Sequence, residues 1–282
     1  MSVDDLTDDA RQREQMKWML GQPHGIILLT GPTGSGKTTT LYSFLNDLNT
    51  EKVNITTIED PVENRIHGIN QTQVNERAGV TFASSLRSIL RQDPNIIMVG
   101  EIRDEETAHI AVQAAITGHL VLSTLHTNDS VTTVTRLIDM GIKPYLVADA
   151  LVGAIAKRLV RRLCPNCRVK HFITPYESEK TGLKPDTQVF APKGCARCNY
   201  TGYKGRLGVY EIMQVTDPLK DAITDGDFSS EKLKKVAAKE GLVPLVEACA
   251  QLVKEGKTSV EEMDLLMTAE ETEQTPAPKV SA

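Results

Sequence analysis

The stretch Gly31-Pro32-Thr33-Gly34-Ser35-Gly36-Lys37-Thr38 decides the fold of this chain. It has the form G-x-x-x-x-G-K-[ST], with the aliphatic run 25–30 before it and the helix-compatible run 39–45 after it. A strand, a glycine-rich loop and a helix in this order indicate a phosphate-binding loop, whose backbone N–H groups turn toward a triphosphate. We therefore expect Lys37 to reach the β- and γ-phosphates and the Thr38 hydroxyl to ligate Mg²⁺. The residues expected to bind the nucleotide are Gly31, Pro32, Thr33, Gly34, Ser35, Gly36, Lys37, Thr38 and Thr39.

The composition is that of an ordinary globular protein. Of the 282 residues, 40% are hydrophobic and 24% are charged. Residues 261–282 hold six acids and one lysine, which equals the whole net charge of −5, so the remainder is formally neutral. Without a basic excess, and with 4% aromatic residues, we expect no nucleic-acid partner. We also expect no transmembrane segment and no secretory leader, and thus a cytoplasmic protein.

Apolar runs alternate with helical patterns between residues 21 and 150. Strands are predicted at 26–30, 53–58, 96–99 and 120–125, and helices at 38–48, 82–91, 105–115 and 131–140. Such apolar strands separated by helices favour a mostly parallel sheet covered on both faces, an α/β fold. The expected divisions are a lead-in segment 1–20, a core 21–150, a cysteine-containing subdomain 151–212, a helical subdomain 213–268 and a disordered tail 269–282.

Acidic residues follow two of the predicted strands. Glu59, Asp60 and Glu63 come after the strand at 53–58, and Glu101 comes after the strand at 96–99. A phosphate-binding loop that supports hydrolysis needs carboxylates at neighbouring strand ends, to hold the metal and to polarise the attacking water. These four acids are the candidates for that chemistry.

A histidine ends a third predicted strand. His126 falls at the carboxyl end of the strand at 120–125, where ligands bind in open α/β sheets. Its imidazole could contact the γ-phosphate, or it could serve as a structural hydrogen-bonding group. The residue by itself leaves both interpretations open.

Two C-x-x-C pairs indicate a metal site. Cys164 and Cys167 form the first pair, Cys195 and Cys198 the second, and 27 residues separate them. Four thiolates complete the tetrahedral coordination of a structural zinc ion, although the intervening segment is longer than in most zinc ribbons. A disulfide does not suit a cytosolic protein, and a redox role needs a single exposed pair.

A basic cluster precedes the first cysteine pair. Lys157, Arg158, Arg161 and Arg162 fall at helical i, i+3, i+4 spacing. We predict a solvent-exposed helix face, with contact to an acidic partner or a neighbouring subunit as the alternative.

Four motifs in order resemble the secretion and pilus assembly ATPases of the type II secretion and type IV pilus family. They are a Walker A loop at 31–38, an aspartate box at 58–63, a Walker B block at 93–104 and a histidine box at 118–127. The match runs from about residue 25 to residue 267. It implies a RecA-like P-loop core that hydrolyses ATP with Mg²⁺ and works as a homo-hexamer.

The resemblance also implies roles for individual residues. Glu63 corresponds to the general base or water-orienting acid, a choice over Glu59 that the spacing does not decide. Glu101 helps to hold Mg²⁺, and Glu59 with Asp60 supports that site. The histidine-box residues His119 and His126 couple the site to neighbouring elements.

Within this family, the Cys₄ insertion is typical of the pilus extension and type II secretion ATPases. The resemblance therefore implies a motor that drives pilin or pseudopilin polymerisation, lies peripheral to the inner membrane and docks on a platform protein there. Two alternatives remain: an ATPase of a related DNA-uptake pilus, and a non-catalytic nucleotide-binding adaptor of an assembly platform.

The chain departs from the family pattern at its start. Family members carry N-terminal domains that contribute arginines to a shared ATP site, whereas about two dozen residues precede the first predicted strand here. The chain is then either a catalytic fragment or naturally short. Because arginine fingers can be worth ~10³-fold or more in rate, we expect nucleotide binding with weak hydrolysis and weak hexamer formation.

Overall fold

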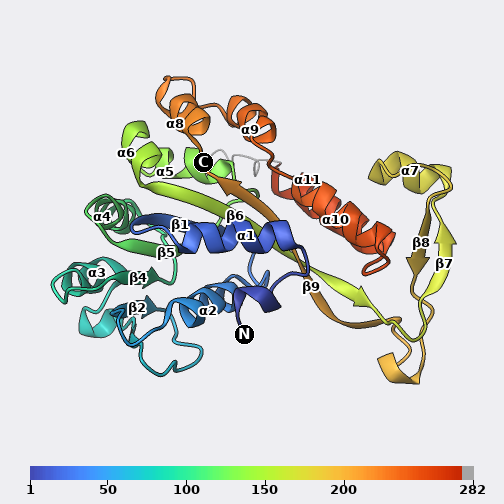
Figure 1. Ribbon diagram of the computed structural model, residues 1–282, viewed down its shortest axis with the longest axis horizontal. Helices are drawn as coiled ribbons and strands as arrows, with labels where there is room; N and C mark the ends of the chain where they lie inside the picture. Colours follow the sequence, from blue (N-terminus) through green and yellow to red (C-terminus); the bar gives the residue numbers. More distant parts are fainter. Residues whose placement is uncertain (275–282) are drawn as a thin grey trace, which may run out of the picture. The chain divides into compact units, whose positions relative to one another are not determined.

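A computed structural model describes the backbone of residues 1–274 and the side chains of residues 1–268 (Figure 1). The chain forms two compact units. The first comprises Met1–Lys157 and Glu211–Leu242, and the second comprises Arg158–Tyr210 and the chain from Val243 onward. Among the described residues, no helix combines the length and the apolar character needed to cross a bilayer.

One seven-stranded sheet organises the first unit, in the order β3-β2-β4-β5-β1-β6-β9. Its strands are β1 (Gly25–Thr30), β2 (Ile55–Glu59), β3 (Asn70–Gln73), β4 (Ile96–Val99), β5 (Leu120–Leu125), β6 (Leu151–Leu163) and β9 (Tyr203–Gln214). The pairs β1–β5, β1–β6, β2–β3, β2–β4 and β4–β5 are all parallel. The carboxyl ends of these strands therefore meet at one edge of the sheet.

The four strands predicted from apolar runs are present. Residues 96–99 and 120–125 match the prediction, the first strand begins one residue earlier, and the second is shifted to 55–59. All residues of β1, β2, β4 and β5 are buried, as expected for parallel strands covered on both faces. The α/β prediction is confirmed.

Helices lie on both faces of this sheet (Figure 1). Those of the first unit are α1 (Ala10–Leu20), α2 (Lys37–Leu48), α3 (Phe82–Ile89), α4 (Glu105–Ile116), α5 (Thr132–Asp139), α6 (Pro144–Ala150), α8 (Asp217–Thr224) and α9 (Ser230–Lys239), with 3₁₀ turns η1 (Val3–Asp5) and η2 (Glu76–Ala78). Ile26 and Leu28 of β1 join the core formed with α4, α5, α6 and α8. The helices predicted at 38–48, 82–91, 105–115 and 131–140 are α2, α3, α4 and α5, each displaced by at most two residues at either end.

The second unit contains a small two-stranded sheet and packed helices. Its elements besides the ends of β6 and β9 are β7 (Val169–Phe172), α7 (Pro175–Thr181), β8 (Gln188–Ala191), η3 (Ala196–Cys198), α10 (Leu245–Lys254) and α11 (Val260–Gln274). β7 and β8 pair antiparallel, α10 packs on β8, and α11 packs on α7 and α10. Of the predicted tail 269–282, the first six residues continue α11 and the remainder lies outside the described residues.

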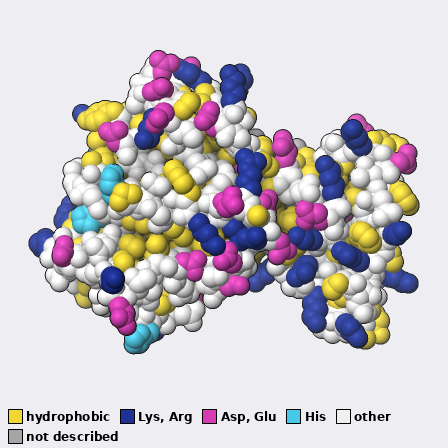
Figure 2. Space-filling view, viewed as in Figure 1, with side chains coloured by type: hydrophobic (Ala, Val, Ile, Leu, Met, Phe, Trp, Pro, Cys, Tyr) yellow, Lys and Arg dark blue, Asp and Glu magenta, His cyan; other side chains and the backbone are white. Residues whose placement is uncertain are grey.

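Basic side chains dominate the central part of the second unit. Residues 158–210 contain eleven lysines and arginines and three acids. Figure 2 shows dark blue side chains spread over the visible face of this unit. This segment is therefore strongly basic within a chain whose net charge is −5.

The basic cluster does not form an exposed helix, so that prediction is wrong. Lys157, Arg158, Arg161 and Arg162 belong to strand β6. The aliphatic run before them pairs with β1 and carries the strand on through the charged residues. Lys157 and Arg158 are buried, being 3% and 6% exposed. The spacing of the four charges suits a helix, but pairing of this segment with β1 determines that it forms a strand.

Candidate functional site

The phosphate-binding loop joins β1 to α2, as predicted. Gly31, Gly34 and Gly36 have φ angles of 139°, 80° and 84°, a backbone region that side chains with a Cβ rarely adopt. Gly36 is the N-cap of the twelve-residue helix α2, which begins at Lys37. The first-turn N–H groups of a helix have no intrahelical partner, so this end of α2 is suited to an anion.

The side chains of the loop also fit a triphosphate. The Ser35 hydroxyl is buried and has no hydrogen-bond partner among the described residues. The Lys37 ammonium turns back over the loop and donates to the carbonyls of Gly31 (2.7 Å) and Pro32 (3.1 Å). An unpartnered hydroxyl and a cation folded over the loop are groups that phosphate oxygens would engage.

A carboxylate and a histidine meet at the ends of two adjacent strands. Glu101 follows β4 and His126 follows β5, and their Oε2 and Nε2 atoms are 3.4 Å apart. The other carboxylate oxygen of Glu101 lies 2.5 Å from Nη2 of Arg103. The Glu101 carboxylate raises the pKa of Arg103 through this contact. Glu101 is therefore held between two nitrogen-bearing side chains.

Glu59 and Glu63 lie in different environments. Glu59 is buried, and its carboxylate accepts from Tyr42 (2.5 Å), Thr57 (2.5 Å) and Gln71 (3.1 Å). Burial, followed by the hydrogen bond to Glu59, raises the pKa of Tyr42 to about 12. The Tyr42 oxygen in turn accepts from the backbone N–H of Glu63 (3.2 Å), whose side chain is exposed. Both carboxylate oxygens of Glu59 accept hydrogen bonds within the protein, so of these two glutamates Glu63 has the accessible carboxylate.

The structure brings most of the predicted site residues to one edge of the sheet. The phosphate-binding loop, residues 60–63, Glu101 and His126 all follow carboxyl ends of parallel strands, and Glu59 is the last residue of β2. Asp60 is exposed and lies 4.0 Å from Arg103.

His119 does not join this edge. It precedes β5, at the opposite edge of the sheet, and its Nδ1 lies 3.0 Å from the Ala114 carbonyl. A six-residue parallel strand separates the two edges by ~20 Å.

Three residues of this region were not assigned from the sequence. Arg103 holds Glu101, Tyr42 holds Glu59, and Lys157 donates to the first turn of α2. Arg103 lies within the Walker B block, two residues beyond Glu101, and Lys157 belongs to the basic cluster for which a different role was predicted. Tyr42 and Lys157 act through contacts with residues of other elements, which no local sequence pattern shows.

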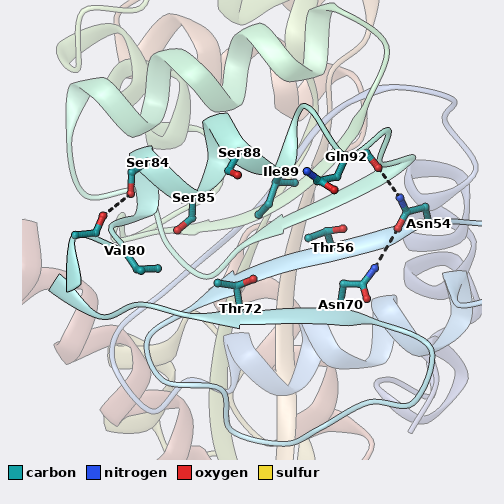
Figure 3. A pocket seen from close by; sticks show the side chains of 11 residues that line it. Asn54, Thr56, Asn70, Thr72, Val80, Ser84, Ser85, Ser88, Ile89 and Gln92 are labelled. Atoms are coloured by element: carbon teal, nitrogen blue, oxygen red, sulfur yellow. Dashed lines mark hydrogen bonds between the residues drawn. The ribbon is translucent and has the colours of Figure 1, made fainter. Parts of the chain in front are cut away.

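A cavity of about 600 Å³ lies elsewhere in the first unit, between α3 and strands β2 and β3 (Figure 3). Its lining is uncharged and includes Asn54, Thr56, Asn70 and Ser85. None of the predicted site residues lines it. The cavity is therefore separate from the residues of the candidate site.

The four cysteines predicted to bind zinc form one cluster in the second unit. Their sulfur atoms all lie within 4.8 Å of one another, and Sγ of Cys198 is 3.8 Å from those of Cys167 and Cys195. Tetrahedral Zn–S bonds of about 2.3 Å would place the sulfurs ~3.8 Å apart, so the cluster fits zinc. Burial opposes ionisation of Cys198, but backbone N–H groups of Cys195 and Gly202 lower its pKa to about 6.

Comparison with known proteins identifies the family. A family model described as "Type II/IV secretion system protein" matches residues 1–265. The chain belongs to the type II/IV secretion system protein family. It is 54% identical over 215 residues to the type II secretion system protein E of Dickeya dadantii, which covers 76% of this chain and 43% of that protein. It is 48% identical over 271 residues to the type IV pilus assembly ATPase TfpB of Acinetobacter baylyi. That match covers 93% of this chain and 45% of TfpB.

The chain thus spans less than half the length of these two relatives of the type II/IV secretion system family. Among solved structures, the pilus retraction motor PilT with bound ADP matches with a TM-score of 0.71 and 28% identity, over 99% of this chain and 68% of that one. The Legionella pneumophila ATPase DotB matches in fold, with a TM-score of 0.70 and 21% identity. That match covers 95% of this chain and 66% of the DotB chain. These findings confirm the predicted family and the α/β ATPase fold.

Proposed function

We propose that the chain is the catalytic region of an ATP-hydrolysing motor of the type IV pilus assembly or type II secretion kind, which drives pilin or pseudopilin polymerisation. One observation carries the proposal: the phosphate-binding loop, Glu63 and the Glu101–His126 pair follow strand ends at one sheet edge. A non-catalytic adaptor needs the loop but has no need for these carboxylates.

Each group has a role in this proposal. The loop N–H groups and Lys37 hold the phosphates, while Thr38 and Glu101 hold Mg²⁺. Glu63 orients the attacking water, and Arg103 and His126 keep Glu101 in place. When bound, ATP supplies the phosphoryl group whose transfer to water drives the motor.

The four cysteines would hold a structural Zn²⁺, because four thiolates leave no coordination position open for substrate. We further propose that the full protein works as a homo-hexamer on the cytoplasmic side of the inner membrane, docked on a platform protein. The basic segment 158–210 supports that location, since anionic lipid headgroups attract lysine and arginine. The names of the relatives, which include a type II secretion protein E and a pilus assembly ATPase, support the machine class.

The test compares phosphate release from ATP by the wild-type chain, Lys37→Ala and Glu101→Gln. We expect slow turnover that rises with protein concentration in the wild type, and a rate at least about 10²-fold lower in both variants. Lys52→Ala, which changes an exposed lysine outside the site, is the matched control and should keep the wild-type rate. Equal, near-zero rates for wild type and Glu101→Gln, with ATP still bound, would favour the nucleotide-binding adaptor instead.

A further inference from the structure

A buried lysine lies beside the phosphate-binding loop. In the parallel pairing of β1 with β6, Thr30 is opposite Ala156. Lys157 is the next residue along β6, at the level where β1 gives way to the loop, and it is 3% exposed. Its side chain therefore enters the interior at the base of the loop.

The lysine ammonium closes the first turn of α2. Its Nζ donates to the carbonyl of Gly36 (3.1 Å) and to the hydroxyl of Thr40 (2.8 Å). The same carbonyl accepts from the Thr40 backbone N–H (3.2 Å) and from the Thr40 hydroxyl (3.3 Å). Gly36 and Thr40 bracket Lys37 and Thr38, so these bonds hold the turn that presents both residues.

Burial of this group is energetically unfavourable. Desolvation lowers the pKa of Lys157 to about 8, which records the cost of keeping a charge away from water. An apolar side chain of similar length at such a position is often neutral or stabilising. A gain in stability therefore does not explain why a lysine occupies this position. Its hydrogen bonds to Gly36 and Thr40, which hold the first turn of α2, do explain it.

We infer that Lys157 is a positioning residue for nucleotide binding, because its ammonium fixes the turn from Gly36 to Thr40 that orients Lys37 and Thr38. The inference rests on the proposed function. It assigns no contact between Lys157 and the nucleotide, and the effect passes through the helix turn.

The test measures binding of a fluorescent ATP analogue and the melting temperature of the nucleotide-free chain. Lys157→Met keeps the length of the side chain and removes the donor, and it should raise the Kd about tenfold without lowering the melting temperature. Lys157→Gln keeps a neutral donor and should restore the Kd to within a few-fold of wild type. Lys52→Met, at an exposed lysine, should leave both quantities unchanged.

A double-mutant cycle with Thr40→Val then tests whether the effect of Lys157 on nucleotide binding passes through the first turn of α2. If both residues act through the same turn, the effects of Lys157→Met and Thr40→Val on Kd will not be additive. An unchanged Kd in Lys157→Met, an equal loss in Lys157→Gln, or strictly additive effects would each overturn the inference. Should Lys157→Met fail to fold, an unchanged Kd in Thr40→Val would overturn it.

Failure of the proposed function gives a different result. In that case the wild-type chain would bind the analogue no better than Lys37→Ala does, before any change at Lys157 is considered.

Discussion

Oε2 of Glu101 and Nε2 of His126 stand 3.4 Å apart at the ends of neighbouring parallel strands. Because Arg103 contacts its other oxygen, the Glu101 carboxylate is held from two sides. Preorganised charged groups of this kind contribute most to catalysis when they need not move during reaction.

Removal of the Glu101 charge should abolish turnover and spare binding. We expect Glu101→Gln to lower the rate of ATP hydrolysis at least about 10²-fold while the Kd for ATP changes by no more than a few-fold. His126→Asn should have a smaller effect, since Arg103 still holds the carboxylate. Phosphate release and analogue binding measure the two quantities. A Glu101→Gln variant with more than a tenth of the wild-type rate would contradict the assignment.

Glu59 and Glu63 should separate stability from activity. Glu59→Gln should lower the free energy of unfolding by about 1–3 kcal/mol, because an amide cannot accept all three of the donors that the buried carboxylate now receives. Glu63→Gln, at an exposed position, should leave stability unchanged and lower turnover. Urea unfolding and phosphate release are the measurements. If Glu59→Gln instead lost activity at full stability, Glu59 would be the base.

Zinc should be needed for the stability of the second unit and not for nucleotide affinity. Elemental analysis should find about one Zn²⁺ per chain. The double change Cys164→Ser and Cys167→Ser, like chelation, should lower the melting temperature, because metal binding contributes folding energy. The Kd for ATP should change much less. Loss of binding at unchanged stability would contradict a structural role.

The contribution of Lys157 to the stability of the chain should increase with pH in alkaline solution. Its pKa is about 8 when folded and about 10.4 when unfolded, so between these values the unfolded state binds more protons. The cost of burying the charge is complete below pH 8 and is relieved as the pH increases. Relative to Lys157→Met, the wild-type free energy of unfolding should increase by about 2 kcal/mol from pH 8 to pH 10. Urea unfolding of both proteins checks this, and a difference independent of pH would contradict it.

Much of the fold could be predicted because its central strands are continuous apolar runs. The strand 70–73 could not, since Asn-Gln-Thr-Gln at a sheet edge carries no apolar signal. The sequence pattern does not indicate strand β6, because the second half of this strand carries four basic residues. Two of them are buried, and this depends on the elements that pack against the strand. Pairing between distant segments is not a property of a local pattern.

The candidate site divides in the same way. The positions of the loop, Glu101 and His126 could be predicted because each lies within two residues of the end of a strand that the sequence pattern indicates. The histidine box also predicted a site role for His119. Strand β5 lies between the two histidines, so His119 is at the opposite edge of the sheet from His126. The proposal of Glu63 rather than Glu59 as the base rests on the hydrogen bonds of Tyr42, which lies on a different element.

Helix α2 carries Lys37 at its first position and Tyr42 five residues later, on the same helix. Tyr42 is bonded to Glu59 and to the backbone of Glu63, so one helix holds the phosphate-binding end and the support of the acidic segment. A change in the position of α2 would therefore also change the position of Glu63. Under the proposed function, phosphate binding at one end of this helix and the placement of Glu63 would be coupled.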